Sequence, residues 1–230
     1  MVELQQRPIR QIKSFVRRQG RMTQSQIKAM ESWWPLYGVT LGDEPVDLNE
    51  LFRKEKPVIM EIGFGMGGSL AAMAHKDAER NYLGVEVHLP GVGNLLKLLH
   101  ENGLENVRLV NDDANRLLDL LPDDCLSGLL LFFPDPWPKK RHHKRRIVQP
   151  EWIERIAQKL KPGGFIHMAT DWEPYALWMQ EVMEASPLFV NRAGDGGFHP
   201  RPDYRPMTKF EQRGKRLGHG VWDLIYDYRT

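Results

Sequence analysis

Strand-like and helix-like segments alternate through the middle of the chain, and this alternation limits the folds that it can adopt. The strand-like segments are short and largely apolar, and they span residues 56–65, 81–87, 106–111, 126–133 and 165–170. Helix-forming segments follow them in turn, at residues 69–79, 93–103, 114–121, 150–164 and 172–185. Apolar strands joined by helices are typical of a parallel sheet that is covered on both faces. The sequence therefore predicts an α/β fold, and the alternating segment 220–228 predicts a last strand.

Local signals place some of the helix ends. Ser69 stands where a capping residue would begin the helix at 69–79, and Gly103 stands where a left-handed residue would end the helix at 93–103. The helix at 172–185 carries a stripe of large side chains, for which we favour core packing over a base platform. The stripe consists of Trp172, Tyr175, Trp178 and Met179.

The two ends of the chain differ from its middle. Residues 1–35 predict a basic N-terminal arm, partly helical or flexible, ahead of a single domain at 36–230. Cys125 is the single cysteine, so no internal disulfide is possible, and a reducing compartment such as the cytoplasm is expected. The N-terminus lacks the apolar core of a signal peptide, and the apolar stretch around 128–133 is far too short to cross a bilayer. We therefore expect no membrane partner.

The net charge of +2 conceals a separation of charge along the chain. Residues 1–30, 139–146 and 201–217 hold 19 of the 32 Lys and Arg residues but only 3 of the 30 Asp and Glu residues. One-signed segments around an acidic body indicate a surface that binds a polyanion. The alternative is that these segments are charged only to keep flexible tails in solution.

A glycine-rich turn follows the first strand, in the segment EIGFGMGGS at 61–69. Gly63 and Gly65 would let the backbone approach a bound nucleotide closely. Glu86 ends the second strand, where a carboxylate can accept both ribose hydroxyls, and Asp113 ends the third, where it could accept from an adenine amine. Glu61, ahead of the glycines, suits a ligand that carries an ammonium group rather than a pyrophosphate.

These acids favour a site for S-adenosylmethionine, which has a ribose and an ammonium group but no phosphate. A dinucleotide site is the main alternative, because glycine-rich turns serve both kinds of ligand. Glu61 could also be a buried acid that caps the loop amides, and Glu86 and Asp113 could be ordinary surface acids at strand ends. Their common position at the carboxyl ends of successive strands favours the ligand site.

The segment FFPDPWPKKRHHKRR, residues 132–146, ends the fourth strand with three prolines and then six cations. Proline fixes φ and restricts the residue before it, so we expect Asp135 and Trp137 to be held extended and stiff. Asp135 would then project toward the transferable methyl group, and Asp171 after the fifth strand could flank the same pocket. Trp137 could stack on a base or cover the edge of the sheet.

This segment, together with ATDWEPYA (169–176), TKFEQRG (208–214) and the glycine-rich turn, resembles the tRNA (guanine-N7-)-methyltransferases of the TrmB family. The resemblance covers about residues 55–228. It implies a class I S-adenosylmethionine-dependent methyltransferase fold. Such a fold is Rossmann-like, with a mostly parallel seven-stranded sheet, helices on both faces and an antiparallel last strand. It also implies transfer of a methyl group to N7 of guanine 46 in the variable loop of tRNA.

The resemblance implies roles for individual residues as well. Asp135 would be catalytic. The residues that would bind S-adenosylmethionine are Glu61, Gly63, Gly65, Glu86, Asp113 and Asp135. Those that would bind the substrate are Lys139, Asp171, Thr208, Lys209, Phe210 and Glu211. RNA would be bound by Arg141, His142, His143, Lys144, Arg145 and Arg146. For TKFE at 208–211, a structural turn is the alternative reading.

The chemistry of guanine N7 agrees with this assignment. N7 has a free lone pair and no proton, so the protein has only to align two atoms and place negative charge near the growing cation. A carboxylate could also accept the N1–H and amino protons of guanine, which adenine does not offer in the same arrangement. His142 and His143 lack accompanying acids or cysteines at metal-binding spacing, so no metal is expected.

The sequence leaves two rival functions open: an NAD-dependent oxidoreductase with an unrelated basic loop, and an RNA-binding module with a vestigial pocket. It also leaves open whether the protein is a monomer or a homodimer.

Overall fold

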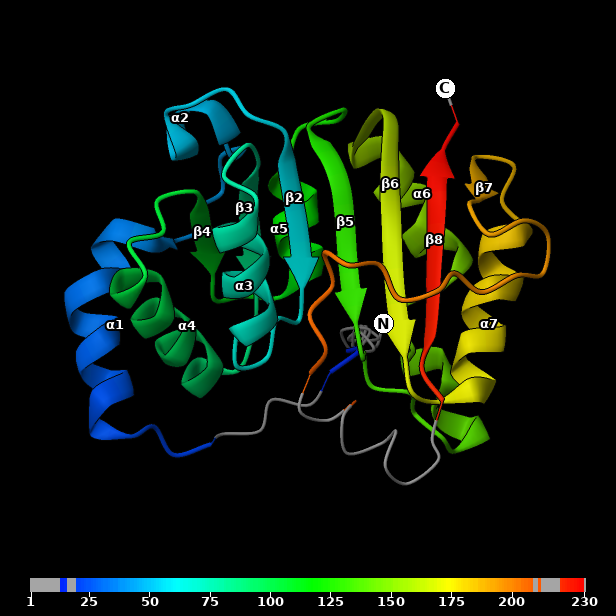
Figure 1. The fold of residues 1–230 in the computed structure, drawn as a ribbon, viewed down its shortest axis with the longest axis horizontal. Helices are drawn as coiled ribbons and strands as arrows, with labels where there is room; N and C mark the ends of the chain where they lie inside the picture. The colour runs from blue at the N-terminus through cyan, green and yellow to red at the C-terminus, as the bar shows by residue number, and fades with distance from the viewer. Residues whose placement is uncertain (1–12, 16–19, 209–210, 212–219, 230) are drawn as a thin grey trace, which may run out of the picture.

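A single eight-stranded sheet forms the centre of the computed structural model, which describes residues 13–15, 20–208, 211 and 220–229. The strand order is β1-β4-β3-β2-β5-β6-β8-β7 (Figure 1). The strands are β1 (Gly38–Val39), β2 (Val58–Ile62), β3 (Asn81–Val85), β4 (Val107–Val110), β5 (Leu126–Phe132), β6 (Leu160–Thr170), β7 (Phe189–Asn191) and β8 (Trp222–Tyr228).

Strands β1 to β6 run parallel, whereas β8 is antiparallel to both of its neighbours, β6 and β7. The carboxyl ends of β2, β3, β4, β5 and β6 therefore meet at one edge of the sheet, the lower edge in Figure 1. This confirms the expected mostly parallel sheet with an antiparallel last strand. The two-residue β1 is an extra edge strand beyond the seven that the resemblance implies.

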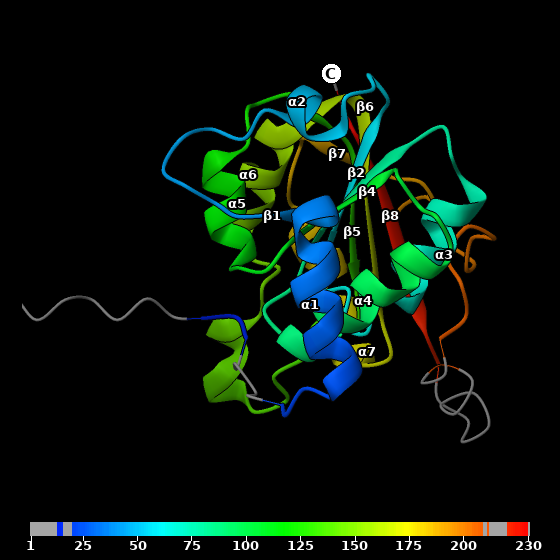
Figure 2. The same ribbon diagram turned by 90° about the vertical axis from the view of Figure 1, so that its left-hand side faces the viewer.

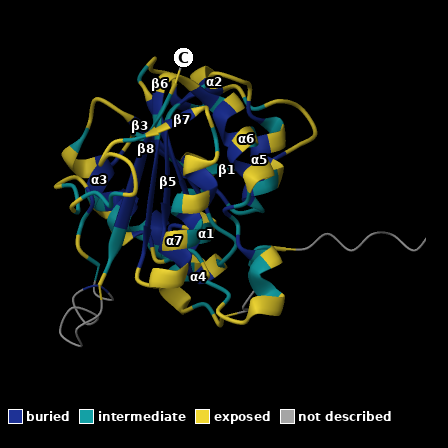
Figure 3. Cartoon of the chain, turned by 90° about the vertical axis from the view of Figure 1, so that its right-hand side faces the viewer, coloured by how far each residue is buried: buried dark blue, intermediate teal, exposed yellow. Residues whose placement is uncertain are grey.

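Helices cover both faces of the sheet (Figure 2). One face packs against α1 (Gln24–Tyr37), α3 (Gly68–Lys76) and α4 (Leu89–Glu101). The other packs against α2 (Leu48–Phe52), α5 (Ala114–Leu120), α6 (Pro150–Lys159) and α7 (Glu173–Glu184). Every residue of β2 and β3 is buried, as Figure 3 shows for the centre of the molecule. Burial on both faces explains why these strands read as continuous apolar runs.

Some local expectations were wrong in detail. Helix α3 begins after Gly67, whose φ is +76°, so Ser69 lies inside the helix and is not its cap. Helix α6 ends at Lys159, because residues 160–164 already belong to the long strand β6. Trp172, expected in the core, precedes α7 and is 40% exposed, whereas Tyr175 and Met179 are fully buried. Gly103, expected as the left-handed residue where this helix stops, has a φ of +60° and lies two positions after α4 ends at Glu101.

The N-terminal helix α1 packs on α4. It opens with a reciprocal capping box between Thr23 and Gln26. The Gln26 side chain then donates to the carbonyl oxygen of Pro90 at 3.0 Å, and the ring of Trp33 stacks on His100 with a centroid distance of 4.3 Å. The described part of the N-terminal region thus reaches the start of α4 through side-chain contacts. No helix of the described residues has the length and hydropathy needed to span a membrane.

Candidate active site

A cavity of about 200 Å³ lies at the carboxyl edge of the sheet. Its lining includes four of the six residues predicted to bind S-adenosylmethionine, namely Gly63, Glu86, Asp113 and Asp135. The other two, Glu61 within β2 and Gly65, do not line the cavity, whereas a further acid, Asp112, does. Residues from the ends of four strands therefore converge on one space, as expected for ligand sites in open α/β sheets.

Glu86 connects the glycine-rich turn to the end of β3 through hydrogen bonds. Its carboxylate accepts from the backbone N–H of Gly65 at 2.9 Å, of Val87 at 2.7 Å and of His88 at 2.9 Å. Gly65 has a φ of +56°, which favours glycine, and this conformation directs its N–H toward the carboxylate. Glu86 therefore shapes the turn in addition to facing the cavity.

The first turn of α4 also supports the glycine-rich turn. A Cβ atom on Gly91 would lie 2.0 Å from the carbonyl oxygen of Gly65, so only glycine allows this close approach. Sequence reasoning missed this residue, because Gly91 stands outside the glycine-rich motif and its neighbour in space is 26 positions away.

Glu61 is a buried carboxyl group with an unsatisfied oxygen. Its side chain is 2% exposed, and Oε2 has no hydrogen-bond partner among the residues that the structure describes. Burial, reinforced by the negative charge of Glu86, raises the pKa of Glu61 to about 8. A buried acceptor without a donor is rare in folded proteins. Its surroundings fit a ligand that brings a donor group, and the ammonium group of S-adenosylmethionine is one.

Asp113 and its neighbours line the part of the cavity that follows β4. Asp113 caps α5 by accepting from the N–H of Asn115 at 3.0 Å. Asp112 forms an ion pair with Arg116 at 2.6 Å, and Asn111 donates to the carbonyl oxygen of Glu86 at 2.7 Å. The predicted adenine contact, Asp113, therefore also has a structural role, and sequence reasoning missed the supporting residues Asn111 and Asp112.

Asp135 lies between two residues with unusual backbone conformations. Phe133 has a φ of +53° and Trp137 a φ of +44°, values that bulky residues rarely adopt and that cost about 1–3 kcal/mol each. The expectation of an extended Trp137 was therefore wrong. Each of these residues precedes a proline, which disfavours the right-handed helical region, and the chain takes the left-handed region instead. Asp135 itself is exposed and faces the cavity.

Trp137 contacts the described part of the N-terminal arm. Its indole N–H donates to the carbonyl oxygen of Ser14 at 3.0 Å, and the guanidinium of Arg145 lies 4.0 Å from the centre of its ring. Arg145 also donates to the carbonyl oxygens of Lys13 and Phe15, at 3.1 and 3.3 Å. Ser14 and Phe15 line the cavity. Nothing in the sequence marked these N-terminal residues as part of the site.

The basic run after Trp137 forms a short 3-10 helix, η1 (Lys140–Arg145). Lys139, Arg141 and Lys144 are exposed, and His142 and His143 are half-buried. Arg146 differs from the other predicted RNA contacts: it is only 4% exposed, and its Nε donates to the carbonyl oxygen of Pro136 at 3.0 Å. Arg146 therefore stabilises the proline segment from the protein interior. Within the described ranges, no group of His, Cys, Asp and Glu residues is arranged to hold a metal ion.

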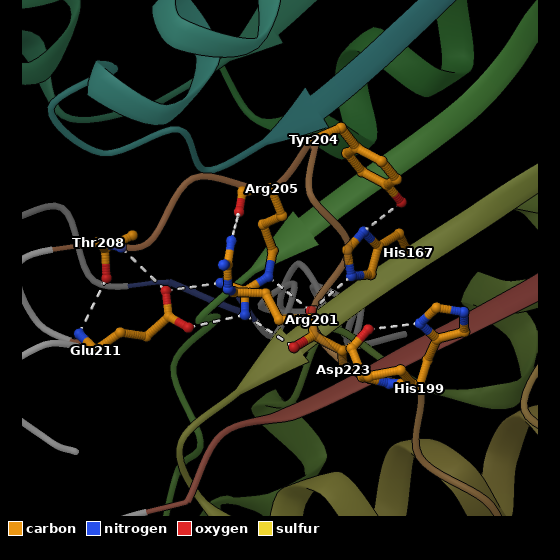
Figure 4. Close-up of polar contacts among 9 residues, drawn as sticks. His167, His199, Arg201, Tyr204, Arg205, Thr208, Glu211 and Asp223 are labelled. Carbon is orange, nitrogen blue, oxygen red and sulfur yellow. Dashed lines mark hydrogen bonds and ion pairs between the residues drawn. The ribbon is translucent and has the colours of Figure 1, made fainter.

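The predicted substrate residues fall into two places. Asp171 follows β6 and is exposed, but it does not line the cavity. Thr208 and Glu211 belong to a buried polar network that also includes Arg205, Asp223 and His167 (Figure 4). Lys209 and Phe210 lie outside the described residues.

Comparisons with known proteins show which family this chain resembles. The family model Methyltransf_4, described as "Putative methyltransferase", matches residues 55–224. A tRNA (guanine-N(7)-)-methyltransferase of Hydrogenovibrio crunogenus is 60% identical over 219 residues, which cover 95% of this chain and 91% of the relative. The enzyme of the same name from Marinobacter nauticus is 55% identical over 222 residues, covering 96% and 93%.

Solved structures resemble the fold at much lower sequence identity. The 16S rRNA methyltransferase KamB superposes with a TM-score of 0.59 at 16% identity, over 82% of this chain and 96% of that one. An rRNA methylase from Streptococcus thermophilus gives a TM-score of 0.54 at 13% identity, over 83% and 100%. At these identities the likeness concerns the fold, which is that of class I S-adenosylmethionine-dependent methyltransferases.

Proposed function

Because this chain belongs to the family of tRNA (guanine-N7-)-methyltransferases, we propose that it methylates N7 of guanine 46 in the variable loop of tRNA. The observation that carries the proposal is the cavity at the carboxyl edge of the sheet, which brings Gly63, Glu86, Asp113 and Asp135 together. S-adenosylmethionine, when bound, supplies a methyl group activated by its sulfonium charge.

The acids of the cavity suit the polar groups of the donor molecule. Glu61 offers its unsatisfied oxygen to the ammonium group, and Asp113 offers a carboxylate to the adenine amine. Glu86 uses one oxygen for two N–H groups and the other for one, which leaves one lone pair to accept from a ribose hydroxyl. Gly63 and Gly65 keep the backbone close to the ligand.

Asp135 acts on the guanine in this proposal. Its exposed carboxylate faces the cavity, and the proline segment holds it there. Arg146 supports that segment by donating to the carbonyl oxygen of Pro136. Negative charge there stabilises the positive charge that develops on the purine, and a carboxylate that accepts the N1–H and amino protons distinguishes guanine from adenine. Guanine N7 has no proton to lose, so Asp135 does not have to act as a base.

Exposed cations around the cavity bind the tRNA backbone. Lys139, Arg141 and Lys144 are free of carboxylate partners in the described part of the chain and border the Asp135 segment. Phosphate contacts of this kind position the substrate without reading its sequence. We place the reaction in the cytoplasm, consistent with the single cysteine.

The decisive experiment uses unmodified tRNA, labelled S-adenosylmethionine and chain cleavage at N7-methylguanine. We expect one cleavage site, at position 46. The matched control is the same tRNA with 7-deazaguanine at that position, which has no nitrogen to accept the methyl group and should remain unlabelled. Labelling of the 7-deaza tRNA, or cleavage elsewhere, would refute the assignment. Saturable binding of NADH in preference to S-adenosylmethionine would instead favour an oxidoreductase.

A further inference from the structure

A buried arginine connects the loop before Thr208 to the strands of the sheet. Arg205 is 1% exposed, and its guanidinium contacts two carboxylates, those of Asp223 on β8 and Glu211 (Figure 4). The loop that carries Arg205 crosses the front of β5 and β6 in Figure 1, on the α3 side of the sheet. Arg205 is therefore the point at which this loop is fixed to the sheet.

The contact with Asp223 anchors the arginine to the sheet. Nε donates to Oδ1 of Asp223 at 2.6 Å, and Nη2 donates to Oδ2 at 2.8 Å. Burial is the largest influence on Arg205 and opposes its charge, but the hydrogen bonds with Glu211 and Asp223 outweigh burial and raise the pKa of Arg205. The arginine thus stays charged in the interior.

His167 on β6 holds Asp223 from the other side. Its Nε2 lies 2.8 Å from Oδ1 of Asp223, and its Nδ1 lies 2.8 Å from the hydroxyl of Tyr204. Burial outweighs the attraction of Asp223 and lowers the pKa of His167, so the ring is neutral at pH 7. A neutral ring that donates from Nε2 and accepts the Tyr204 proton at Nδ1 satisfies all three groups.

The contact with Glu211 also holds Thr208, three positions earlier in the chain. Nη1 and Nη2 of Arg205 donate to the two oxygens of Glu211, at 2.7 and 2.8 Å. Glu211 and Thr208 also exchange hydrogen bonds: the N–H of Thr208 donates to Oε2 at 3.0 Å, and the N–H of Glu211 donates to the Thr208 hydroxyl at 3.1 Å. This is the reciprocal arrangement of a capping box. The side chain of Glu211 thus has three donors within the protein.

The same guanidinium lies beside two residues of the cavity wall, although Arg205 itself does not line the cavity. It lies 5.8 Å from the ring centre of Phe132 and 5.7 Å from that of Phe133, and both phenylalanines line the cavity. Phe133 stands two residues before Asp135. Arg205 therefore binds Glu211 on one side and faces the rings of Phe132 and Phe133, which lead to Asp135, on the other.

Stability alone does not account for this network. Removing three charges from water is costly, and replacing a buried ion pair by apolar residues of similar volume is often neutral or stabilising. What an arginine adds is geometry, because its planar fork holds two carboxylates in fixed positions.

We infer that Arg205 is a positioning residue for the reaction, which seats Thr208 and Glu211 against the carboxyl edge of the sheet beside Asp135. The inference rests on the proposed function and deepens it. Arg205 does not contact the substrate. It acts through Glu211, whose carboxylate it orients, and through the rings of Phe132 and Phe133.

The test compares Arg205→Lys with wild type in steady-state kinetics on tRNA and in donor binding by calorimetry. Lysine keeps the charge but lacks the planar fork that holds two carboxylates in fixed positions. We expect a loss in kcat of roughly tenfold to a hundredfold, because small displacements of positioning groups have effects of this size. The donor Kd should change by less than about twofold, because Arg205, Thr208 and Glu211 are not among the residues that line the cavity. Arg192→Lys is the matched control, since Arg192 pairs with Asp227 on the same strand and is 40% exposed; its kcat should stay near that of wild type.

A double variant tests whether Arg205 acts through Glu211. If it does, Arg205→Lys combined with Glu211→Gln should lower kcat little more than the more severe single change, because the two changes break the same interaction. Effects that multiply, an unchanged kcat in Arg205→Lys, or parallel losses of kcat and donor affinity would each overturn the inference.

Amide hydrogen exchange separates this inference from the proposed function. Arg205→Lys should speed exchange at Thr208 and Glu211 while Arg192→Lys does not, and this readout does not depend on the reaction catalysed. If wild type fails to methylate tRNA, the proposed function is wrong. Unaltered hydrogen exchange in Arg205→Lys would refute the role of Arg205, whatever reaction the protein catalyses. Should Arg205→Lys fail to fold, Thr208→Val weakens the same anchor from its other end. It should then lower kcat with donor affinity retained, and an unchanged kcat would overturn the inference.

Discussion

The buried carboxyl of Glu61 should make the stability of the ligand-free protein depend on pH. Its ordinary pKa of 4.5 is raised to about 8 in the folded protein, first by burial and then by the charge of Glu86. Because the folded state holds this proton more tightly than the unfolded state, the contribution of Glu61 is fully favourable below pH 4.5 and is lost as the pH rises toward 8. One pKa unit corresponds to about 1.4 kcal/mol, so the full loss is about 5 kcal/mol.

The substitution Glu61→Gln isolates this effect, since glutamine has nearly the same shape and does not titrate. Unfolding by urea at constant ionic strength between pH 5 and pH 8 should show wild type losing roughly 3 to 4 kcal/mol relative to the variant. The decisive quantity is how steeply the free energy of unfolding changes with pH in each protein. A difference that is the same at every pH could come from the new amide. Parallel curves for the two proteins would show that Glu61 is already ionised at pH 5 and that burial does not raise its pKa.

Donor binding gives the same group a second readout. An ammonium group at the unsatisfied oxygen of Glu61 should lower the pKa of the carboxyl and expel its proton. Calorimetry at pH 7 in buffers of different ionisation enthalpy should therefore find about one more proton released by wild type than by Glu61→Gln. Equal proton release would place the ammonium group elsewhere.

Other substitutions address the rest of the site. Asp135→Asn should lower kcat by roughly 10²-fold to 10³-fold with the melting temperature unchanged, because the side chain is exposed and acts through its charge; full activity would exclude it as the electrostatic centre. Replacing Arg141 and Lys144 by Ala should reduce the slope of log affinity for tRNA against log salt by about 0.7–0.9 for each phosphate that is no longer neutralised, and an unaltered slope would leave this exposed pair without a role. Arg146→Ala should instead lower the melting temperature, since Arg146 is buried. Trp137→Phe removes the hydrogen bond to Ser14 and should make the N-terminal region more sensitive to protease near residue 14, and identical cleavage rates would argue against that hydrogen bond.

The sheet and its functional edge were predictable from the sequence because they depend on local signals. Strands buried on both faces carry mostly apolar side chains, and parallel strands bring their carboxyl ends together. Glu86, Asp113 and Asp135 each follow such a strand, so their convergence on one cavity follows from topology. The resemblance to a known family supplied the substrate, which the acids alone would not have identified.

Contacts between distant segments were not predictable, since they depend on tertiary packing. Trp137 meets Ser14 across 123 positions, and Arg205 reaches Asp223 across 18. The basic run looked uniform in the sequence, yet Arg145 and Arg146 donate to backbone carbonyls of the protein itself. Backbone conformation also escaped prediction: proline excludes one region for the preceding residue but does not choose among the others, as the positive φ of Trp137 shows.

Because α1 packs on α4, a series of contacts connects this N-terminal helix to the donor site. Gln26 donates to the carbonyl oxygen of Pro90, and the residue after Pro90, Gly91, lies against the carbonyl oxygen of Gly65. The N–H of Gly65 in turn donates to Glu86. A shortened protein comprising only residues 36–230 would keep nearly all of the cavity wall while losing the brace behind it. Loss of donor affinity on such trimming would therefore combine two effects, the relaxation of the glycine-rich turn and the removal of Ser14 and Phe15 from the cavity wall.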